Sequence, residues 1–185
     1  MHSASSEHSF IILAGLPGTG KTTLARVLAR RLRAAYVRID SIEQAIRDCD
    51  VLKDQVGASG YYVGHRVAKD NLVLGLSVVA ESVNPLAITR DAWRRVGQRT
   101  GAKVFEVELV CSDPIEHRRR VEQRESDIED LELPTWSQVL DRHYEHWKRP
   151  HVVVDTASAT VEQTVTDLLV SLGLAPDHGA SLITQ

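Results

Sequence analysis

The feature that most constrains this chain is the stretch Phe10–Arg33, where an apolar run, a glycine-rich loop and a helical pattern follow one another. The loop reads GLPGTGKT over residues 15–22 and fits the spacing G-x-x-x-x-G-K-[ST]. Glycines let backbone N–H groups approach phosphate oxygens, because no Cβ intervenes and positive φ angles cost little. The stretch therefore predicts a strand, a phosphate-binding loop and a helix whose N-terminus adds its positive dipole.

The polar side chains of this loop have expected partners on a bound nucleotide. Lys21 is expected to reach the β- and γ-phosphates of ATP, and the Thr22 hydroxyl to take a Mg²⁺ position. A coincidental glycine-rich turn is the alternative, which the strand before and the helix after the loop disfavour. The predicted nucleotide-binding residues are Gly15, Leu16, Pro17, Gly18, Thr19, Gly20, Lys21, Thr22 and Thr23, with Asp155 ordering a loop beside the adenine.

Composition indicates one globular domain rather than a nucleic-acid-binding or membrane protein. The 185 residues are 43% hydrophobic and 25% charged, and the net charge of −3 gives no support to non-specific DNA or RNA binding. No apolar run approaches the roughly 18 residues that span a bilayer. Cys49 and Cys111 lack the spacing of metal ligands, so we expect free thiols in a reducing compartment, the cytoplasm. Residues 1–9 are predicted to be a disordered leader and 173–185 a C-terminal tail.

Beyond the loop, strand-like runs alternate with helical patterns five times, which predicts an α/β fold with a parallel sheet covered on both faces. The domain is expected to span residues 10–172, with a lid at about 118–135. The predicted strands cover 10–14, 34–39, 77–82, 104–110 and 151–155. The predicted helices cover 21–33, 41–47, 61–76, 85–100, 114–124, 136–147 and 160–172.

Four of these helix starts carry capping signals. Ser41 and Thr135 each precede a Glu or Gln at the spacing of a capping box or close to it, and Asn84 and Asp113 each precede a proline suited to the first helical position. We expect the four helices to begin at these residues.

Three carboxylates follow predicted strands, and ligands of parallel sheets bind at the carboxyl ends of strands. Asp40 is well placed to accept the proton of an acceptor hydroxyl, and its alternative role is a helix N-cap. Glu81 occupies the position of an acid that holds Mg²⁺ directly or through water. Its alternative is a strand-end acid paired with a helix arginine. Asp155 is the third.

Arginines near the predicted lid supply the cations that phosphoryl transfer requires. Arg120 and Arg124 are spaced i, i+4 on one expected helix face, from which a closing lid brings them onto the phosphates. The alternative is a solvated basic face, which we expect for Arg118 and Arg119.

The acceptor pocket is expected over Asp40, within residues 41–70. Arg47 follows Asp40 on the same helix and is expected to clamp substrate or phosphate, whereas Arg90 is a weaker candidate. Aromatic and hydrogen-bonding residues such as Tyr61 come from the next helix, and their alternative role is packing against a neighbour. The predicted substrate-binding residues are Asp40, Arg47, Tyr62, His65 and Arg66.

Together, these features resemble small P-loop kinases that phosphorylate hydroxyl groups. That group includes gluconate and shikimate kinases, adenylylsulfate kinase, chloramphenicol phosphotransferase, zeta-type toxins and polynucleotide 5′-kinase. The resemblance rests on GLPGTGKTT, on Asp40 after the second strand, on the VVAES strand and on an R-x-x-x-R helix before a lid. It implies a three-layer α/β/α P-loop NTPase fold with a five-stranded parallel sheet of order 2-3-1-4-5.

The resemblance also implies roles for individual residues. Asp40 matches the catalytic base or substrate anchor, Arg120 and Arg124 match the lid arginines, and Glu81 matches the third-strand acid. The chain departs from the group in three ways. It has no D-G-D or D-x-D after the second strand, and its third strand ends in Glu where relatives commonly have Asp.

The leading hypothesis is therefore ATP- and Mg²⁺-dependent phosphorylation of a hydroxyl on a small molecule, a metabolite or an antibiotic. Lys21, Arg120 and Arg124 would stabilise the transferring group, and Thr22 and Glu81 would serve the metal. A polynucleotide 5′-hydroxyl kinase is one alternative, disfavoured by the net charge of −3. A non-catalytic ATP-dependent switch is another, disfavoured by Asp40. We expect a monomer or homodimer with no nucleic-acid or membrane partner.

Overall fold

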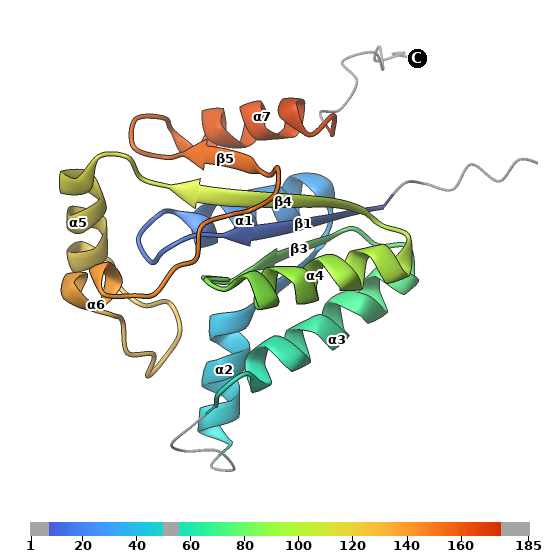
Figure 1. The fold of residues 1–185 in the computed structure, drawn as a ribbon, viewed down its shortest axis with the longest axis horizontal. Helices are drawn as coiled ribbons and strands as arrows, with labels where there is room; N and C mark the ends of the chain where they lie inside the picture. Colours follow the sequence, from blue (N-terminus) through green and yellow to red (C-terminus); the bar gives the residue numbers. More distant parts are fainter. Residues whose placement is uncertain (1–7, 50–55, 175–185) are drawn as a thin grey trace, which may run out of the picture.

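The computed structural model describes residues 8–49 and 56–174 and contains the predicted five-stranded parallel sheet (Figure 1). The strand order is β2-β3-β1-β4-β5, which confirms the predicted order 2-3-1-4-5. The register places Ile11 of the first strand between Val79 and Phe105. The strands are β1 (Ser9–Ala14), β2 (Ala35–Arg38), β3 (Val78–Glu81), β4 (Lys103–Val110) and β5 (Val152–Asp155).

Two hydrophobic cores lie on opposite faces of the sheet, because successive β1 side chains alternate between the faces. Ile11 and Leu13 belong to the core beneath α1 and α7, and Phe10 and Ile12 to the core beneath α3 and α4. Figure 1 shows the helices on both sides of the sheet, so the three-layer prediction is confirmed. The covering helices are α1 (Lys21–Leu32), α3 (Ser59–Val73), α4 (Ala87–Thr100) and α7 (Val161–Ser171).

Three further helices stand at the edge of the sheet where the strands end. Figure 1 shows α5 and α6 beyond the arrowhead of β4, and α2 beside α3. Residues 124–135 connect α5 to α6 and form the central part of the predicted lid. These helices are α2 (Ile39–Asp48), α5 (Pro114–Gln123) and α6 (Trp136–Leu140).

Two of the predicted helix starts are confirmed. The Asp113 side chain accepts hydrogen bonds from the backbone N–H groups of Ile115 and Glu116. Thr135 and Gln138 form a reciprocal capping box at the start of α6. Both signals succeed because a cap of this kind involves only residues within one turn.

The predicted start of α2 at Ser41 is wrong. The strand β2 ends at Arg38, and α2 begins at Ile39 without a side-chain cap. Ile39 is buried against α3 and α4, so the chain turns into the helix early enough to place this side chain in the core. Asp40 consequently lies in the first helical turn, where the helix dipole favours a negative charge.

The predicted start of α4 at Asn84 is also wrong, since the helix begins at Ala87. The Ala87 N–H donates instead to the Glu145 carboxylate, 2.7 Å away. Asn84 has a positive φ of 51° and lies in the connection before the helix. A cap that comes from 58 residues away leaves no local sequence signal.

The predicted end of α6 at residue 147 is wrong, because the helix stops at Leu140. The chain after it packs aromatic rings against Arg90, whose guanidinium lies 4.8 Å from the Tyr144 ring and 4.3 Å from the Trp147 ring. Trp147 also stacks on His151 with 4.1 Å between ring centres. These long-range contacts outweigh the helical pattern of the segment.

The predicted leader ends one residue too late, since Ser9 already belongs to β1 and is buried. Most of the predicted leader (residues 1–7) and tail (residues 175–185) lies outside the described residues. Within residues 8–49 and 56–174, no helix is long and apolar enough to cross a bilayer.

Candidate active site

The glycine-rich loop between β1 and α1 packs so closely on its surroundings that two of its glycines have no room for a side chain. Gly15 has a φ of 143°, and an added Cβ would collide with the Leu109 carbonyl oxygen. Gly18 has a φ of 85°, and an added Cβ would lie 2.5 Å from Val121 Cγ2. The loop is therefore a closely packed turn at the N-terminus of α1, a position that fits the phosphates of a nucleotide.

Hydrogen bonds within the molecule hold the loop in this shape. The Thr19 hydroxyl and the Lys21 ammonium both donate to the Leu16 carbonyl oxygen, at 2.9 and 2.8 Å. His117 Nε2 of α5 lies 2.8 Å from the Pro17 carbonyl oxygen, and the Thr156 hydroxyl donates to the Thr19 carbonyl at 3.1 Å. Sequence reasoning missed His117 and Thr156, because each reaches the loop from an element distant in the chain.

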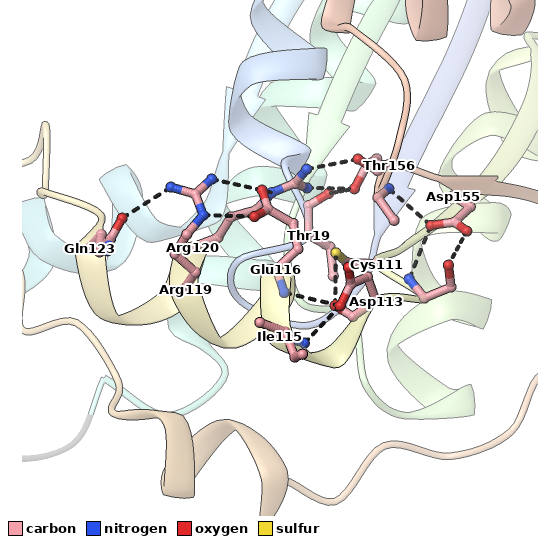
Figure 2. Close-up of polar contacts among 12 residues, drawn as sticks. Thr19, Cys111, Asp113, Ile115, Glu116, Arg119, Arg120, Gln123, Asp155 and Thr156 are labelled. Carbon is pink, nitrogen blue, oxygen red and sulfur yellow. Dashed lines mark hydrogen bonds and ion pairs between the residues drawn. The ribbon is translucent and has the colours of Figure 1, made fainter.

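Arg120 braces this arrangement from α5 (Figure 2). Its guanidinium donates to the hydroxyl and the carbonyl oxygen of Thr156, at 2.9 and 2.8 Å, and to Glu116 at 2.7 Å. Arg119 and Arg120 hold the pKa of Glu116 down at about 2. The structure thus gives Arg120 internal partners on every side of its guanidinium, and contact with a transferring phosphate stays a prediction.

Asp155 at the end of β5 orders the loop that follows it (Figure 2). Its carboxylate accepts hydrogen bonds from the hydroxyl and the backbone N–H of Ser112 and from the Ala157 N–H. These donors lower the pKa of Asp155. The arrangement agrees with the loop-ordering part of the prediction, and the proximity to adenine stays a prediction.

Lys21 lies at the centre of a group of charges that we call the charge cluster: Lys21, Asp40, Glu81, Arg124 and Arg142. Burial lowers the pKa of Lys21 to about 8, the negative charges of Glu81 and Asp40 oppose that fall, and the positive charges of Arg124 and Arg142 add to it. The cluster assembles residues from α1, α2, β3, the lid (Arg124) and the segment after α6 (Arg142).

Asp40 projects from the first turn of α2 and is partly exposed. Among the described residues, no hydrogen bond or ion pair engages its carboxylate. Burial lowers the pKa of Arg124, and the negative charge of Asp40 partly offsets this lowering. The N-cap alternative does not apply, since Arg38 occupies the N-cap position.

Glu81 ends β3 and is only 4% exposed, so burial raises its pKa. The Tyr36 hydroxyl donates to Glu81 Oε1, and Arg38 Nε lies 3.3 Å from the same oxygen. Glu81 Oε2 is buried and has no partner among the described residues. The alternative role of Glu81, an acid paired with a helix arginine, is therefore met only in part. The arginine beside Oε1 is Arg38 at the end of β2, and Oε2 has no partner among the described residues.

These observations fit Mg²⁺, which prefers oxygen ligands. Thr22 supplies a hydroxyl in the first turn of α1, and Glu81 supplies its free carboxylate oxygen. Both residues were predicted for this role, and the metal contacts themselves stay a prediction.

Arg124 and Arg120 do not share a helix face as predicted. The helix α5 ends at Gln123, and Arg124 has the extended angles φ −71° and ψ 144°. Its side chain is half-buried, which lowers its pKa, and its Nε has no partner among the described residues. Arg124 therefore turns into the charge cluster, whereas Arg120 stays on α5 and braces the loop.

The lid segment after α5 makes a charged contact with the far edge of the sheet. The Asp127 carboxylate accepts hydrogen bonds from Arg38 Nη1 at 3.0 and 2.9 Å and forms an ion pair with Arg26 of α1. Arg38 holds the pKa of Asp127 down at about 2. Arg38 thus links the lid to Glu81.

The predicted acceptor residues on α3 are not gathered around Asp40. Tyr62 is 72% exposed, and Arg66 is exposed as well. His65 packs edge-on against Trp93 with 4.3 Å between ring centres, and burial lowers its pKa to about 4, so it is neutral. This arrangement favours the alternative that these residues pack or face solvent, and their contact with substrate stays a prediction.

Tyr61, the neighbour of Tyr62, faces inward instead. Its hydroxyl accepts a hydrogen bond from the Asn84 N–H at 3.1 Å and lies near the charges of Glu43 and Asp40. Arg47 lies one helical turn after Glu43 on α2 and forms a weak ion pair with it, with 4.0 Å between Nη2 and Oε2. Tyr61 thus connects α3 with the segment after β3.

Arg90, the weaker arginine candidate, has a structural role. It is 1% exposed and donates to the carbonyl oxygens of Asn84, Pro85 and Glu145. It therefore fixes the connection before α4.

Sequence reasoning also missed Arg142, Ser82 and Asn84. Arg142 lies in a stretch predicted to be helical, and nothing local shows that it returns to Lys21. The polar run Glu81-Ser82-Val83-Asn84 directly after a buried strand is a signal that could have identified the other two.

Comparisons with known proteins agree with this fold and site. The model of the family described as "AAA domain" matches residues 10–146, and the chain belongs to this family. A shikimate kinase of Corynebacterium efficiens is 32% identical over 127 residues, covering 60% of this chain and 75% of that protein. A protein of Aeropyrum pernix named a probable adenylyl-sulfate kinase is 28% identical over 166 residues, covering 84% and 87%.

Solved structures share the fold at low identity. A gluconokinase of Sinorhizobium meliloti is 17% identical with a TM-score of 0.63, covering 90% of this chain and 93% of that one. A sugar kinase of Janibacter sp. is 16% identical with a TM-score of 0.65, covering 91% and 96%. The family, the loop and the curated kinase relatives identify the chain as a P-loop kinase, an ATP-dependent phosphotransferase that acts on hydroxyl groups of small molecules.

Proposed function

We propose that Asp40 is the catalytic base of this kinase and that the acceptor is a hydroxyl-bearing metabolite or antibiotic bound beside it. One observation carries the proposal. The partly buried Lys21 ammonium is close enough to Asp40, Glu81 and Arg124 for their charges to shift its pKa, and among the described residues no hydrogen bond or ion pair engages the Asp40 carboxylate. A carboxylate free to accept a proton next to a phosphate-binding lysine is what phosphoryl transfer to an alcohol requires.

The residues of the charge cluster divide the work. Asp40 orients the acceptor hydroxyl and takes its proton as the new O–P bond forms, with ADP leaving. Lys21 and Arg124 stabilise the negative charge of the transferring group, and Arg142 adds positive charge nearby. Thr22 and Glu81 would hold Mg²⁺, which would supply positive charge to neutralise the phosphates.

The names of the relatives suggest acceptors the size of shikimate or gluconate. We expect the chain to act in the cytoplasm, where the free thiols Cys49 and Cys111 stay reduced, and to be a monomer or homodimer. Fractionation of cells and light scattering of the purified chain test these two expectations.

Asp40→Asn tests the assignment, with ATP consumption over a metabolite and antibiotic panel as the readout. The variant should bind ATP nearly as the wild type does, while transfer to the acceptor falls about 10²-fold, the lower range for a general base. Lys21→Ala should abolish transfer, and its residual ATP consumption gives the background of the assay. Asp70→Asn on the exposed side of α3 is the matched control and should match the wild type. Wild-type turnover in Asp40→Asn would overturn the assignment.

A further inference from the structure

The segment 82–84, directly after β3, is fixed to the nucleotide loop and to α4. Its backbone contacts are Ser82 N–H to the Leu13 carbonyl at 3.2 Å, Gly15 N–H to the Val83 carbonyl at 3.2 Å, and Arg90 Nε to the Asn84 carbonyl at 3.0 Å. The Asn84 N–H donates to the Tyr61 hydroxyl. Backbone hydrogen bonds therefore fix the position of the segment.

Those side chains are buried and unpaired. Ser82 is 4% exposed and Asn84 0% exposed, yet Ser82 Oγ, Asn84 Oδ1 and Asn84 Nδ2 have no hydrogen-bond partner among the described residues. Asn84 also holds a positive φ of 51°, a conformation that asparagine adopts more readily than most residues. Buried polar groups are normally paired, so unpaired ones on a backbone held by hydrogen bonds suggest a function.

The segment connects Glu81 with the nucleotide loop and with α3. The Gly15 N–H donates to the Val83 carbonyl, and the Asn84 N–H donates to the Tyr61 hydroxyl, whose pKa is raised by burial and also by the negative charges of Glu43 and Asp40. Glu81, whose Oε2 has no partner among the described residues, directly precedes the segment. The unpaired groups therefore lie between the nucleotide loop and the helix that faces the acceptor side.

The charges around the segment indicate what kind of acceptor fits. Of the cations that contact the segment or Glu81, Arg90 already donates to three carbonyl oxygens, and Arg38 is paired with Glu81 and Asp127, so neither is free for an anionic group. In the proposed function, Lys21, Arg124 and Arg142 serve the transferring phosphate, and Asp40 and Glu43 would repel an anionic group on the acceptor. The unpaired groups themselves are neutral: an amide, which offers a donor and an acceptor together, and a hydroxyl.

We propose that Asn84, with Ser82, binds the acceptor through a hydroxyl next to the one that is phosphorylated, and that the acceptor is an uncharged polyol such as a cyclitol or a sugar. The inference rests on the proposed function, because it places the acceptor beside Asp40. The Asn84 amide accepts from and donates to the neighbouring hydroxyl, and Ser82 adds a second contact. Asn84 is thus the residue that determines specificity for the acceptor.

Asn84→Gly and Asn84→Asp test the proposal in the full-length chain. Glycine tolerates the positive φ and removes the amide, whereas aspartate keeps the shape and removes the donor. Asn71→Asp on the exposed surface of α3 is the matched control. The probes are neutral polyols (myo-inositol, D-glucose and ribitol), their monodeoxy analogues, and the anions shikimate and gluconate. The readouts are ATP consumption, thermal unfolding, and binding by saturation-transfer NMR with a non-hydrolysable ATP analogue.

We expect the wild type to prefer a polyol. Asn84→Gly should raise the KM for that polyol about 10- to 100-fold, the effect of losing one buried hydrogen bond, with the KM for ATP and the unfolding temperature nearly unchanged. The wild type should bind the monodeoxy analogue more weakly than the parent polyol. Asn84→Gly should bind the two compounds equally well. Asn71→Asp should match the wild type throughout.

Two results would overturn the inference: a lower unfolding temperature with unchanged acceptor KM, which makes the amide structural, or a preference for anions that Asn84→Gly leaves intact. Absence of both polyol binding and polyol transfer would also overturn it. Polyol binding that depends on Asn84 without any phosphate transfer would support the inference and contradict the proposed function instead.

Discussion

The nucleotide loop and the acceptor side of the candidate site differ in how their polar groups are paired. In the loop, Thr19, Lys21 and the bracing residue Arg120 all have hydrogen-bond partners within the chain. On the acceptor side, Glu81 Oε2 and both amide atoms of Asn84 have none among the described residues. The loop is therefore shaped by its own bonds before any phosphate arrives, whereas the acceptor side keeps polar groups available for a ligand.

The same difference separates the two arginines that the sequence predicted as a pair. Arg120 braces the loop, whereas Arg124 belongs to the charge cluster and its Nε has no partner in the part of the chain that the structure describes. A paired arginine is expected to matter for stability, and an unpaired one near the reacting groups for catalysis. Four predictions test this distinction.

The largest effect is expected for Arg124→Ala. Removing a cation that stabilises the transferring group should lower kcat about 10²- to 10³-fold, with the unfolding temperature nearly unchanged. Steady-state kinetics with the acceptor found for the wild type, together with calorimetry, measure both. Arg118→Ala, whose side chain pairs with Glu122 on the surface, is the control. A loss of stability without a loss of turnover would reverse the roles of the two arginines.

Arg120→Ala should act mainly on stability and on the loop. Losing its bonds to Thr156 and Glu116 should lower the free energy of unfolding by about 1–3 kcal/mol and raise the KM for ATP. Arg119→Ala removes an exposed partner of the same Glu116 and should cost almost nothing. Chemical denaturation of the three proteins decides the matter, and equal stabilities would show that Arg120 does not brace the loop.

Lys21 makes ATP binding depend on pH. Its pKa of about 8 in the free protein should rise when phosphates bind, so binding above pH 8 should take up a proton and weaken by up to about tenfold per pH unit. Below pH 7 Lys21 is already charged, and no uptake is expected. Calorimetric titration in buffers of different ionisation enthalpy measures the uptake, which should vanish in Lys21→Ala. A pH-independent affinity between pH 8 and 10 would contradict the lowered pKa.

The smallest effect is expected for Asp127→Asn in the lid. Asp127 is partly exposed, so losing its pairs with Arg26 and Arg38 should weaken lid docking by only about 0.5–1 kcal/mol. Limited proteolysis of the lid should become a few-fold faster, and high salt should have a similar effect on the wild type. The protease should cleave the lid of Glu129→Gln, a nearby control, at the wild-type rate. A wild-type rate in Asp127→Asn as well would show that the ion pairs of Asp127 with Arg26 and Arg38 do not hold the lid.

Much of the fold could be predicted from the sequence, because its signals are local or periodic. Alternation of apolar runs with helical patterns predicted the layers, and the caps at Asp113 and Thr135 needed only neighbouring residues. The predictions failed where distant contacts decided the outcome. Glu145 replaced Asn84 as the cap of α4, and the packing of Trp147 ended α6 early.

The candidate site divides in the same way. The nucleotide residues, with Asp40 and Glu81, could be named because each follows a strand or lies in a motif. The acceptor side could not, because which of two adjacent side chains, Tyr61 or Tyr62, faces inward depends on how α3 packs.

The sequence by itself determined that this chain binds a nucleotide on a parallel α/β sheet, since glycines at fixed spacing after an apolar run leave few other structures open. Only the tertiary structure decided which polar groups remain free once the fold is formed. It paired Arg120, and among the described residues it left Arg124 Nε and the buried Asn84 amide without a partner. The physical reason is that hydrogen-bond pairing depends on distance in space, and residues far apart in the chain supply most of the partners.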